Sequence, residues 1–197
     1  MVSKGLQTRD RILDKAFRLA AREGLEGLSL STLAADLGLS KSGLFAHFTS
    51  KEDLQLEMLR VASERFVEKV MAPAIRRPRG LPRMNAVFDN WREWMMGMPG
   101  GCIFVAAAAE LDDRDGPVRA FVVSQQRELL KALARTARIC VEEGHFRPDL
   151  DVDQFAFDVL AIYLGFHEFH RLLRDPRAVQ RARRAFERLV EDASAKT

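Results

Sequence analysis

The chain of 197 residues holds only two cysteines, Cys102 and Cys140, which are too few for a disulfide framework and lack metal-site spacing. We expect both to be reduced core residues, with a redox switch as the minor alternative. The N-terminus lacks the apolar stretch of a signal peptide, and no segment approaches the ~20 apolar residues that a membrane span requires. These absences predict a cytoplasmic protein with no membrane partner.

An excess of charge of one sign is also missing, because 31 basic and 28 acidic residues leave a formal net charge of +3. This mildly basic balance permits nucleic acid as a partner without establishing it. The chain has no GxSxG, P-loop or HExxH motif, so we expect neither an enzyme nor a cofactor. Hydrophobic residues make up 47% of the chain, which is enough for a buried core and argues against disorder.

Apolar residues recur at helical spacing along the chain, with no strand-like alternation and no internal repeat. The fold class is therefore expected to be all-α, with about nine helices bounded by capping residues, glycines and prolines. The expected ranges are Thr8–Glu23, Leu30–Leu37, Lys41–Phe48, Lys51–Met71, Arg83–Met98, Cys102–Leu111, Pro117–Glu143, Val152–Arg174 and Pro176–Ala193. Thr8 is expected to cap the first helix and Gly24 to end it.

The most informative segment begins at Ser29, which is expected to cap the helix Leu30–Leu37 because its hydroxyl can accept from free N–H groups. Gly38 is expected to adopt the left-handed backbone conformation that ends this helix. Ser40 is expected to cap a second short helix. Two helices joined by so short a turn cross steeply, and the second can lie in a DNA major groove. The segment is therefore predicted to be a helix-turn-helix.

The second of these helices leaves mostly small residues exposed. Leu44 and Phe48 are four residues apart, so they are expected to face the core together. The small outward residues let the helix approach base edges, and Ser42 and His47 offer hydrogen bonds.

The next helix is expected to begin with a capping box of Ser50 and Asp53. Lys51 and the free N–H groups at this helix start would suit a DNA phosphate. Arg9 and Arg11 of the first helix could also reach phosphate groups.

An amphipathic helix, then Ser29 to Gly38, then the run SKSGLFAHFTSKEDL resembles the DNA-binding domain of the TetR family of one-component transcriptional regulators. The resemblance covers about Thr8 to Leu56. It implies an all-helical homodimer with an N-terminal three-helix DNA-binding domain and a C-terminal domain that binds a small molecule and dimerises. We place the boundary after residue 50, which gives domains 1–50 and 51–197.

Matched residue by residue, the resemblance implies a set of DNA-contacting positions. They are Ser31 and Thr32 at the start of the second helix, Lys41, Ser42, Gly43, Phe45, Ala46 and His47 on the recognition helix, and Lys51 on the fourth. Phe45 stands where the family often has Tyr, and Ser31 lies where Arg is common. Both departures weaken a phosphate contact, so we expect an operator different from those of close relatives.

Bulky apolar residues gather on the helices that would enclose a ligand cavity, and such cavities are mostly apolar with few polar anchors. The predicted lining residues are Phe66, Trp91, Trp94, Met95, Met98, Phe104 and Phe166, with Glu110, Tyr163, His167 and His170 as polar candidates. The alternative is that these residues simply fill a core. His167 and His170 share a helix face, but zinc sites need three or four ligands, so no metal is predicted.

The expected helix Val152–Arg174 is apolar nearly all round, so it must be buried on more than one side. One stripe holds Phe155, Val159, Ile162, Phe166 and Phe169, and another holds Phe157, Leu160, Leu164 and Leu172. The predicted dimer interface consists of Phe155, Val159, Ile162, Gly165 and Phe169, with Leu129, Leu133 and Ala137 of the preceding helix. Dimerisation would place two recognition helices about 34–36 Å apart, matching successive major-groove faces.

The function expected from these features is a ligand-responsive repressor. It would bind a palindromic operator as a homodimer and be released by a small, largely apolar effector. The alternatives are a helical dimer with an enzymatic role and one with a purely structural role. DNA binding through phosphates would weaken steeply with salt, which separates the first reading from the others.

Overall fold

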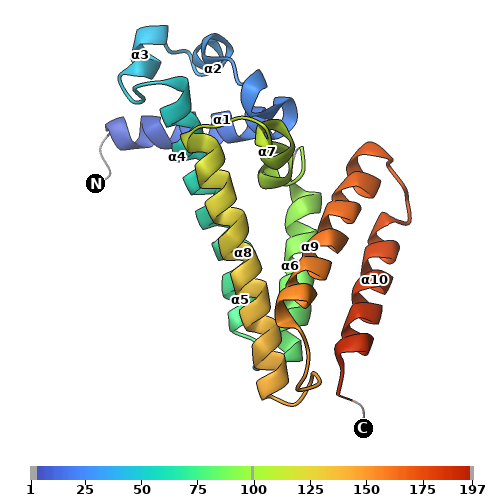
Figure 1. Ribbon diagram of the computed structural model, residues 1–197. Coiled ribbons are helices and arrows are strands. Elements are labelled where there is room, and N and C mark those ends of the chain that lie inside the picture. Colours follow the sequence, from blue (N-terminus) through green and yellow to red (C-terminus); the bar gives the residue numbers. More distant parts are fainter. Residues whose placement is uncertain (1–3, 99, 196–197) are drawn as a thin grey trace. The chain divides into compact units, whose positions relative to one another are not determined.

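The computed structural model describes residues 4–98 and 100–195, and Figure 1 shows helices along the whole of this chain. The helices are α1 Lys4–Gly27, α2 Leu30–Asp36, α3 Lys41–Phe45, α4 Lys51–Phe66, α5 Ala72–Ile75, α6 Leu81–Gly97, α7 Ile103–Leu111, α8 Pro117–Glu142, α9 Val152–His167 and α10 Ala178–Ala193, with π-helical segments η1 Val67–Met71 and η2 Glu168–Leu172. Each π segment continues directly from an α-helix, so the described residues form nine helical stretches. The predicted all-α fold is confirmed.

Several helix ends differ from the sequence-based expectation. α1 begins at Lys4, so Thr8 lies inside the helix and the prediction that it caps the helix is wrong. α3 ends at Phe45 rather than Phe48, because His47 N–H turns back to the Leu44 carbonyl at 3.0 Å. α6 begins at Leu81, ahead of the predicted Arg83, and α10 begins at Ala178, beyond the predicted Pro176.

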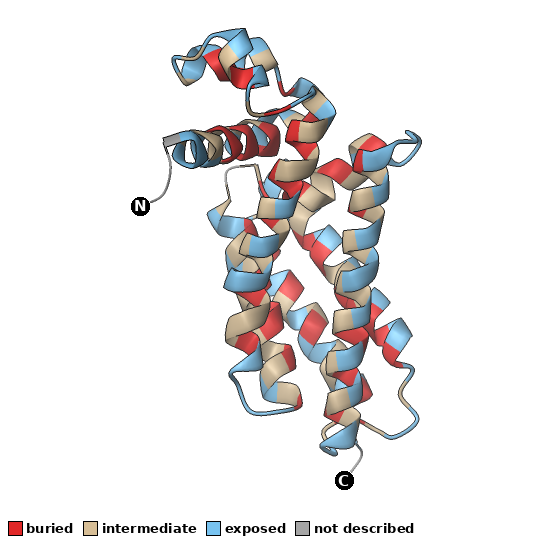
Figure 2. Ribbon diagram, turned by 90° about the vertical axis from the view of Figure 1, so that its left-hand side faces the viewer, coloured by how far each residue is buried: buried red, intermediate tan, exposed pale blue. Residues whose placement is uncertain are grey.

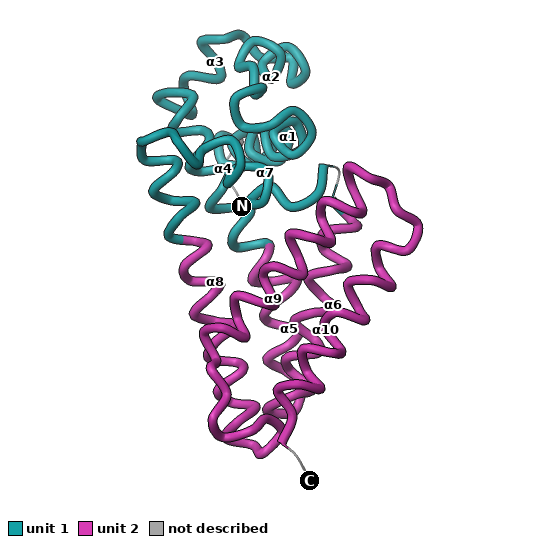
Figure 3. Tube along the Cα trace, turned by 45° about the vertical axis from the view of Figure 1, so that its right-hand side comes forward, with its two compact units in different colours: residues 1–65, 98–124 teal, residues 66–97, 125–197 magenta. Residues whose placement is uncertain are grey.

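Internal contacts group the chain into two compact units, which Figure 3 distinguishes by colour. The first comprises residues 1–65 and 98–124, and the second comprises residues 66–97 and 125–197. Residues of α4 and α7 join the first unit because Leu54 and Ile103 lie in the same buried cluster as Phe17 of α1. The domain boundary after residue 50 stays a prediction.

In the first unit, α1 breaks where the sequence predicted, at Gly24, whose φ is +83° and whose ψ is 167°. The backbone just after this break is held by polar side chains from two other helices. The Glu110 carboxylate accepts from the N–H groups of Leu25 at 3.1 Å and of Glu26 at 3.0 Å. Gln55 donates to the Leu25 carbonyl and Lys51 donates to the Glu26 carbonyl, both at 2.8 Å. These four hydrogen bonds fasten the end of α1 to α4 and α7.

A second close approach in this unit joins the start of α7 to α1. Gly100 has φ +94°, and a Cβ there would lie 1.5 Å from the carbonyl oxygen of Ala21. Only glycine fits, because the obstacle is backbone and because other residues rarely adopt this φ.

In the second unit, α6, α9 and α10 pack through a column of aromatic rings. Phe186 of α10 stacks on Phe88 of α6 with centroids 4.0 Å apart, and Trp91 of α6 stacks on Tyr163 of α9 at 3.5 Å. The Tyr163 hydroxyl donates to the Phe88 carbonyl at 2.6 Å, so a buried polar group is paired. Figure 2 colours these helices by burial and shows buried faces beside exposed ones.

The loop between α8 and α9 is tied to the chain that follows α10. Arg147 N–H donates to the Ala193 carbonyl at 2.9 Å, and Ala195 N–H donates to the His145 carbonyl at 3.3 Å. Between these bonds Phe146 and Ser194 form an isolated antiparallel bridge.

Both cysteines are buried and unpaired, as expected of core residues. Burial raises the pKa of the Cys140 thiol to about 12 and also raises that of Cys102, which leaves little reactive thiolate. Among the helices described, none combines the length and apolar composition needed to cross a bilayer.

Candidate nucleic-acid interface

The helix-turn-helix is built from the capping residues that the sequence indicated. Ser29 Oγ accepts from Thr32 N–H at 3.3 Å at the start of α2, and Ser40 Oγ accepts from Gly43 N–H at 3.0 Å at the start of α3. Gly38 has φ +66°, the left-handed conformation expected at the end of α2. The local geometry predicted from the sequence is confirmed.

The inner face of α3 is fixed by two apolar residues and a cation. Leu44 and Phe48 are 1% and 3% exposed, which confirms that they face the core together. The Arg9 guanidinium lies 5.2 Å from the Phe48 ring centroid and pairs with Glu57 of α4. Arg9 was expected to reach phosphate, but these contacts make it a packing residue, while Arg11 is exposed.

The outer face of α3 carries the residues expected to meet DNA. Lys41, Ser42 and Ala46 are exposed, and Gly43 and His47 are half-buried. Phe45 of this face is 42% exposed.

Gly43 also has a local structural role. A Cβ there would lie 3.2 Å from Ser40 Oγ, which is the hydroxyl that caps α3. Ser42 Oγ also lies 3.0 Å from this hydroxyl, so the three residues form one small cluster. A bulky residue at position 43 would disturb the cap as well as any contact with a base.

The remaining predicted DNA contacts lie at two helix starts. Ser31 and Thr32 are exposed in the first turn of α2. Lys51 is half-buried, and its ammonium already donates to the Glu26 carbonyl, although two of its three N–H donors are left for other partners. At the same helix start Ser50 Oγ accepts from Asp53 N–H at 3.0 Å, while the Asp53 carboxylate accepts from Thr49 N–H at 2.9 Å instead of from Ser50. The cap by Ser50 is thus confirmed, and only the reciprocal bond of the predicted capping box goes to Thr49 in place of Ser50.

Two stretches of the chain match known domains of one protein family. Residues 12–58 match bacterial regulatory proteins of the tetR family, and residues 80–186, more than half of the chain, match the tetracyclin repressor-like C-terminal domain. This chain belongs to the TetR family of transcriptional regulators. It is therefore a DNA-binding regulator and not an enzyme, as the sequence predicted.

Individual TetR-family relatives agree with this assignment. The chain is 27% identical over 151 residues to the transcriptional repressor KstR2 of Mycobacterium tuberculosis, covering 74% of this chain and 72% of KstR2. A TetR regulator from Chloroflexus aurantiacus has a TM-score of 0.85 at 27% identity, over 95% of this chain and 94% of that one. AibR, solved with isovaleryl coenzyme A and operator DNA, has a TM-score of 0.74 at 23% identity, over 95% and 98% of the two chains. The likeness to AibR shows the fold alone.

The residues predicted to line an effector cavity are divided between the two units. Met98, Phe104 and Glu110 belong to the first unit, where Glu110 is used by the backbone of α1. The others belong to the second unit. They are Phe66, Trp91, Trp94, Met95, Tyr163, Phe166, His167 and His170.

Within the second unit these residues form a dense aromatic cluster. Trp91, Met95, Tyr163 and Phe166 are buried, and the Phe66 ring meets the Trp91 ring edge-on with centroids 5.6 Å apart. This packing fits the core-filling alternative for most of the cluster.

Two polar atoms in this region are buried with no hydrogen-bond partner in the part of the chain that the structure describes. They are Trp91 Nε1 and His167 Nε2. Burial, with a smaller effect from Arg171, lowers the pKa of His167, which favours the neutral imidazole. His170 stacks on Phe166 with centroids 5.2 Å apart. Among the described residues, no three His, Cys, Asp or Glu side chains gather as a metal site would require.

The predicted dimer residues differ in what they can offer a second copy. Leu133, Ala137, Phe155 and Val159 are buried among this chain's own residues, so little of their surface is open to a second copy. Leu129 and Ile162 are half-buried, and Phe169 and Gly165 are exposed. Three further exposed apolar residues of α9 and η2 belong to the other stripe, namely Phe157, Leu164 and Leu172.

Sequence reasoning missed two features. The first is the set of hydrogen bonds that join the backbone of Leu25 and Glu26 to Gln55 and Glu110. No sequence pattern pointed to Gln55, and Glu110 was predicted to line the effector cavity. The second is a basic groove along α8, which the alternation of charged and apolar residues in that helix could have indicated.

Proposed function

We propose that this TetR-family regulator is a homodimeric repressor that binds a palindromic operator through α3. The main support is the outer face of α3, where small and polar residues are exposed. Leu44 and Phe48 are buried on the opposite side and pack this segment against the core. Such a helix can approach base edges closely and read them by hydrogen bonds. The 27% identity to a named repressor, KstR2, supports repression as the mode of action.

The proposed contact set keeps the positions expected from the sequence. Lys41, Ser42, Gly43, Phe45, Ala46 and His47 would lie on the major groove, and Ser31, Thr32 and Lys51 beside it. Lys41 would contact phosphate, because it is an exposed cation at the start of the helix. The protein would then act on operator DNA in the cytoplasm.

Selection of bound duplexes from a random DNA pool at physiological salt tests this proposal. We expect an enriched palindrome, because two symmetric copies present two recognition helices. The variant Ala46→Trp should lose this enrichment while keeping the helical content of the parent. Because the Ala46 side chain is exposed, the substitution leaves the cap of α3 intact. Enrichment that survives Ala46→Trp would contradict the assigned surface.

The second copy would dock on α9 and α10. Phe157, Leu164 and Leu172 are 61%, 45% and 70% exposed, which is costly for a lone chain in water. Beside them lies a nearly apolar groove of about 200 Å³. It is lined by Ile162, Gly165, Phe166, Phe169, Ala178, Arg181, Ala182 and Ala185. Apolar helix faces of this kind pair into four-helix interfaces in symmetric dimers.

The effector would bind within the second unit, beside the aromatic cluster. An apolar molecule with one hydrogen-bonding group would satisfy Trp91 Nε1 or His167 Nε2, each of which is costly to leave unpaired. AibR binds isovaleryl coenzyme A, so ligand binding occurs among proteins of this fold. The effector would release DNA only through a difference in its affinity for the bound and free states.

A further inference from the structure

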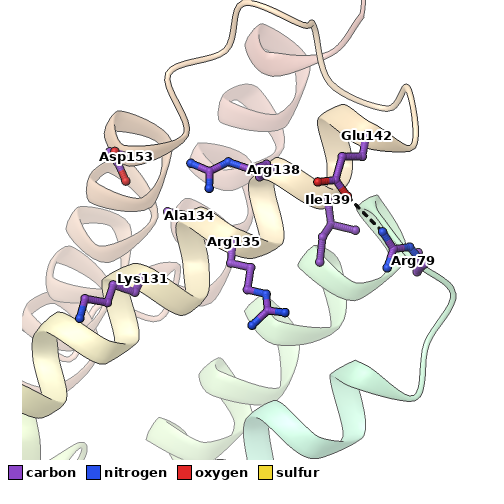
Figure 4. A pocket seen from close by; sticks show the side chains of 8 residues that line it. All are labelled: Arg79, Lys131, Ala134, Arg135, Arg138, Ile139, Glu142 and Asp153. Atoms are coloured by element: carbon purple, nitrogen blue, oxygen red, sulfur yellow. Dashed lines mark hydrogen bonds and ion pairs between the residues drawn. The ribbon is translucent and has the colours of Figure 1, made fainter.

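A groove of about 430 Å³ lies along α8 in the second unit, away from the aromatic cluster (Figure 4). Its lining comes from three elements, which are the loop before α6, the outer face of α8 and the first turn of α9. The lining residues are Arg79, Lys131, Ala134, Arg135, Arg138, Ile139, Glu142 and Asp153. A groove of this size matches the volume of small-molecule sites.

The groove is lined by four basic residues and by two acidic ones, Glu142 and Asp153, so its lining has a net positive charge. Arg79 is neutralised by Glu142 at 3.1 Å and by Glu143 at 2.7 Å, and Lys131 is neutralised by Glu128 at 2.8 Å. Arg135 and Arg138 are exposed and have no ion-pair partner among the residues that the structure describes. Figure 4 shows the ion pair of Arg79 with Glu142, whereas no dashed line joins Arg135 or Arg138 to another of the drawn side chains, and these two extend in different directions from α8.

The unpaired arginines lie three residues apart on one helix face, where like charges repel. Lys131 precedes Arg135 by four residues on the same face, which adds to the repulsion. The nearest acidic residue of α8, Glu142, is already held by Arg79. An anion that binds both guanidinium groups would remove this repulsion.

We propose that the groove binds a small phosphorylated molecule that carries at least two phosphate charges. The planar guanidinium fork binds phosphate oxygens in pairs, and two neighbouring forks suit two linked phosphates. Ala134 and Ile139 give the groove a small apolar surface for the rest of the ligand.

A nucleic acid fits this groove less well than a small molecule. The carboxylates of Glu142 and Asp153 border the groove, so a longer phosphate chain would meet acidic groups. Other arginines line a groove on α10, namely Arg177, Arg181, Arg184 and Arg188. That groove of about 360 Å³ has no apolar residue in its lining, and its Arg181 is already paired with Asp175 at 2.8 Å.

Most of the groove lies on the charged face of α8, outside the apolar surface of α9 and α10 proposed for the second copy, and only Asp153, one turn before Phe157, adjoins that surface. The groove therefore offers a site separate from both the operator surface and the aromatic cluster.

Calorimetric titration of the full chain with inorganic pyrophosphate tests the proposal, with sodium sulfate at equal ionic strength as the reference anion. We expect saturable binding of one pyrophosphate per chain. The double variant Arg135→Gln/Arg138→Gln should bind at least about tenfold more weakly, because it loses charge-assisted hydrogen bonds. Arg184→Gln/Arg188→Gln is the matched control, since it removes two exposed, unpaired arginines of α10, and it should bind pyrophosphate as the parent does.

Equal affinity in the two double variants, or no saturable binding at physiological salt, would overturn the proposal. Circular dichroism checks that both variants keep the parent's helical content. Non-specific duplex DNA is titrated in parallel. If the α8 variant loses affinity for duplex DNA and not for pyrophosphate, the groove serves nucleic acid and the small-molecule site is rejected. Because no operator is used, the result is independent of the proposed operator binding.

Discussion

The Glu110 side chain of the first unit lies directly against the Cα of Gly24 and leaves no room there for a larger residue. A Cβ at Gly24 would lie 2.5 Å from Glu110 Oε1, and φ at Gly24 is +83°. The carboxylate fills the space that a side chain would need, and from there it reaches the Leu25 and Glu26 N–H groups. The break in α1 and the end of α7 are therefore mutually dependent.

Removing the Glu110 carboxylate should loosen this junction. Glu110→Ala leaves the Leu25 and Glu26 N–H groups without their acceptor, so we expect a loss of about 1–3 kcal/mol in the free energy of unfolding. Urea unfolding measures the loss, and hydrogen exchange should accelerate at these two amides. Glu128→Ala is the control, because that carboxylate only pairs with Lys131 at the surface. Its effect should stay within about 0.5 kcal/mol, and equal losses would contradict a specific role for Glu110.

Two glycines close together in sequence should respond oppositely to alanine. Gly100→Ala places a Cβ against the Ala21 carbonyl and strains a positive φ, so we expect at least about 1–3 kcal/mol of destabilisation. Gly97→Ala meets no atom within 4 Å and lies at the end of α6. It should be neutral or stabilise slightly, because alanine favours helix. Thermal unfolding of both variants decides, and a harmless Gly100→Ala would rule out the close approach to α1.

Such contacts mark the limit of what the sequence predicted. Ser29, Gly38 and Ser40 were assigned correctly because caps and left-handed ends depend on residues a few positions away. The hydrogen bond from Leu25 to Glu110 joins residues 85 positions apart, and no local pattern reports it.

The dimer residues were harder to predict for a related reason. Both stripes of α9 are apolar, so periodicity alone could not tell which one the chain's own helices cover. The structure places Phe155 and Val159 in the core and leaves Phe157 exposed. Helix type was thus predictable, but the partner of each face was not.

The salt dependence of DNA binding should report Lys41 directly. Lys41→Ala removes one exposed cation from each subunit, and so two from the proposed dimer interface, and affinity should fall by a similar factor for all sequences. The slope of log affinity against log salt should become shallower by about 2. Fluorescence anisotropy at several salt concentrations measures this slope. Lys69→Ala, an exposed lysine of η1 paired with Glu68, should leave the slope unchanged.

Stability in acid should depend on the pair of Arg9 and Glu57. The Arg9 guanidinium, with Arg60 beside it, holds the pKa of Glu57 below its ordinary value of 4.5. A lowered carboxyl pKa stabilises the fold above the ordinary value, and this contribution disappears as pH falls through the lowered pKa. The pair is half-exposed, so Glu57→Gln should cost about 1 kcal/mol or less near neutral pH.

Urea unfolding between pH 7 and pH 3 tests this pH dependence. The parent and Glu57→Gln should differ at neutral pH and converge as the pH falls below 4.5 and through the lowered pKa. In an Arg9→Gln background the same substitution should have a smaller effect, because the pair is already broken. A difference that grows on acidification would contradict the assigned role of the pair.

The proposed dimer surface can be tested at Gly165. A Cβ there meets no atom within 4 Å in the single chain, so Gly165→Trp should leave the fold intact. In a dimer interface the indole would prevent the two helices from packing closely. We therefore expect the dissociation constant of the dimer to rise at least about tenfold. Sedimentation velocity over a concentration series measures this, with Gly97→Trp as a control in equally open space. Unchanged dimerisation of the Gly165 variant would move the interface elsewhere.

The bonds between residues 145–147 and 193–195 also bear on how this protein can be engineered. Ala195 is an anchored position, so a fluorescent label or affinity tag joined close behind it would pull on the loop between α8 and α9. Truncation before Ser194 would remove the backbone partner of Phe146. A spacer of flexible residues after position 195 would let a fused reporter move without disturbing that loop.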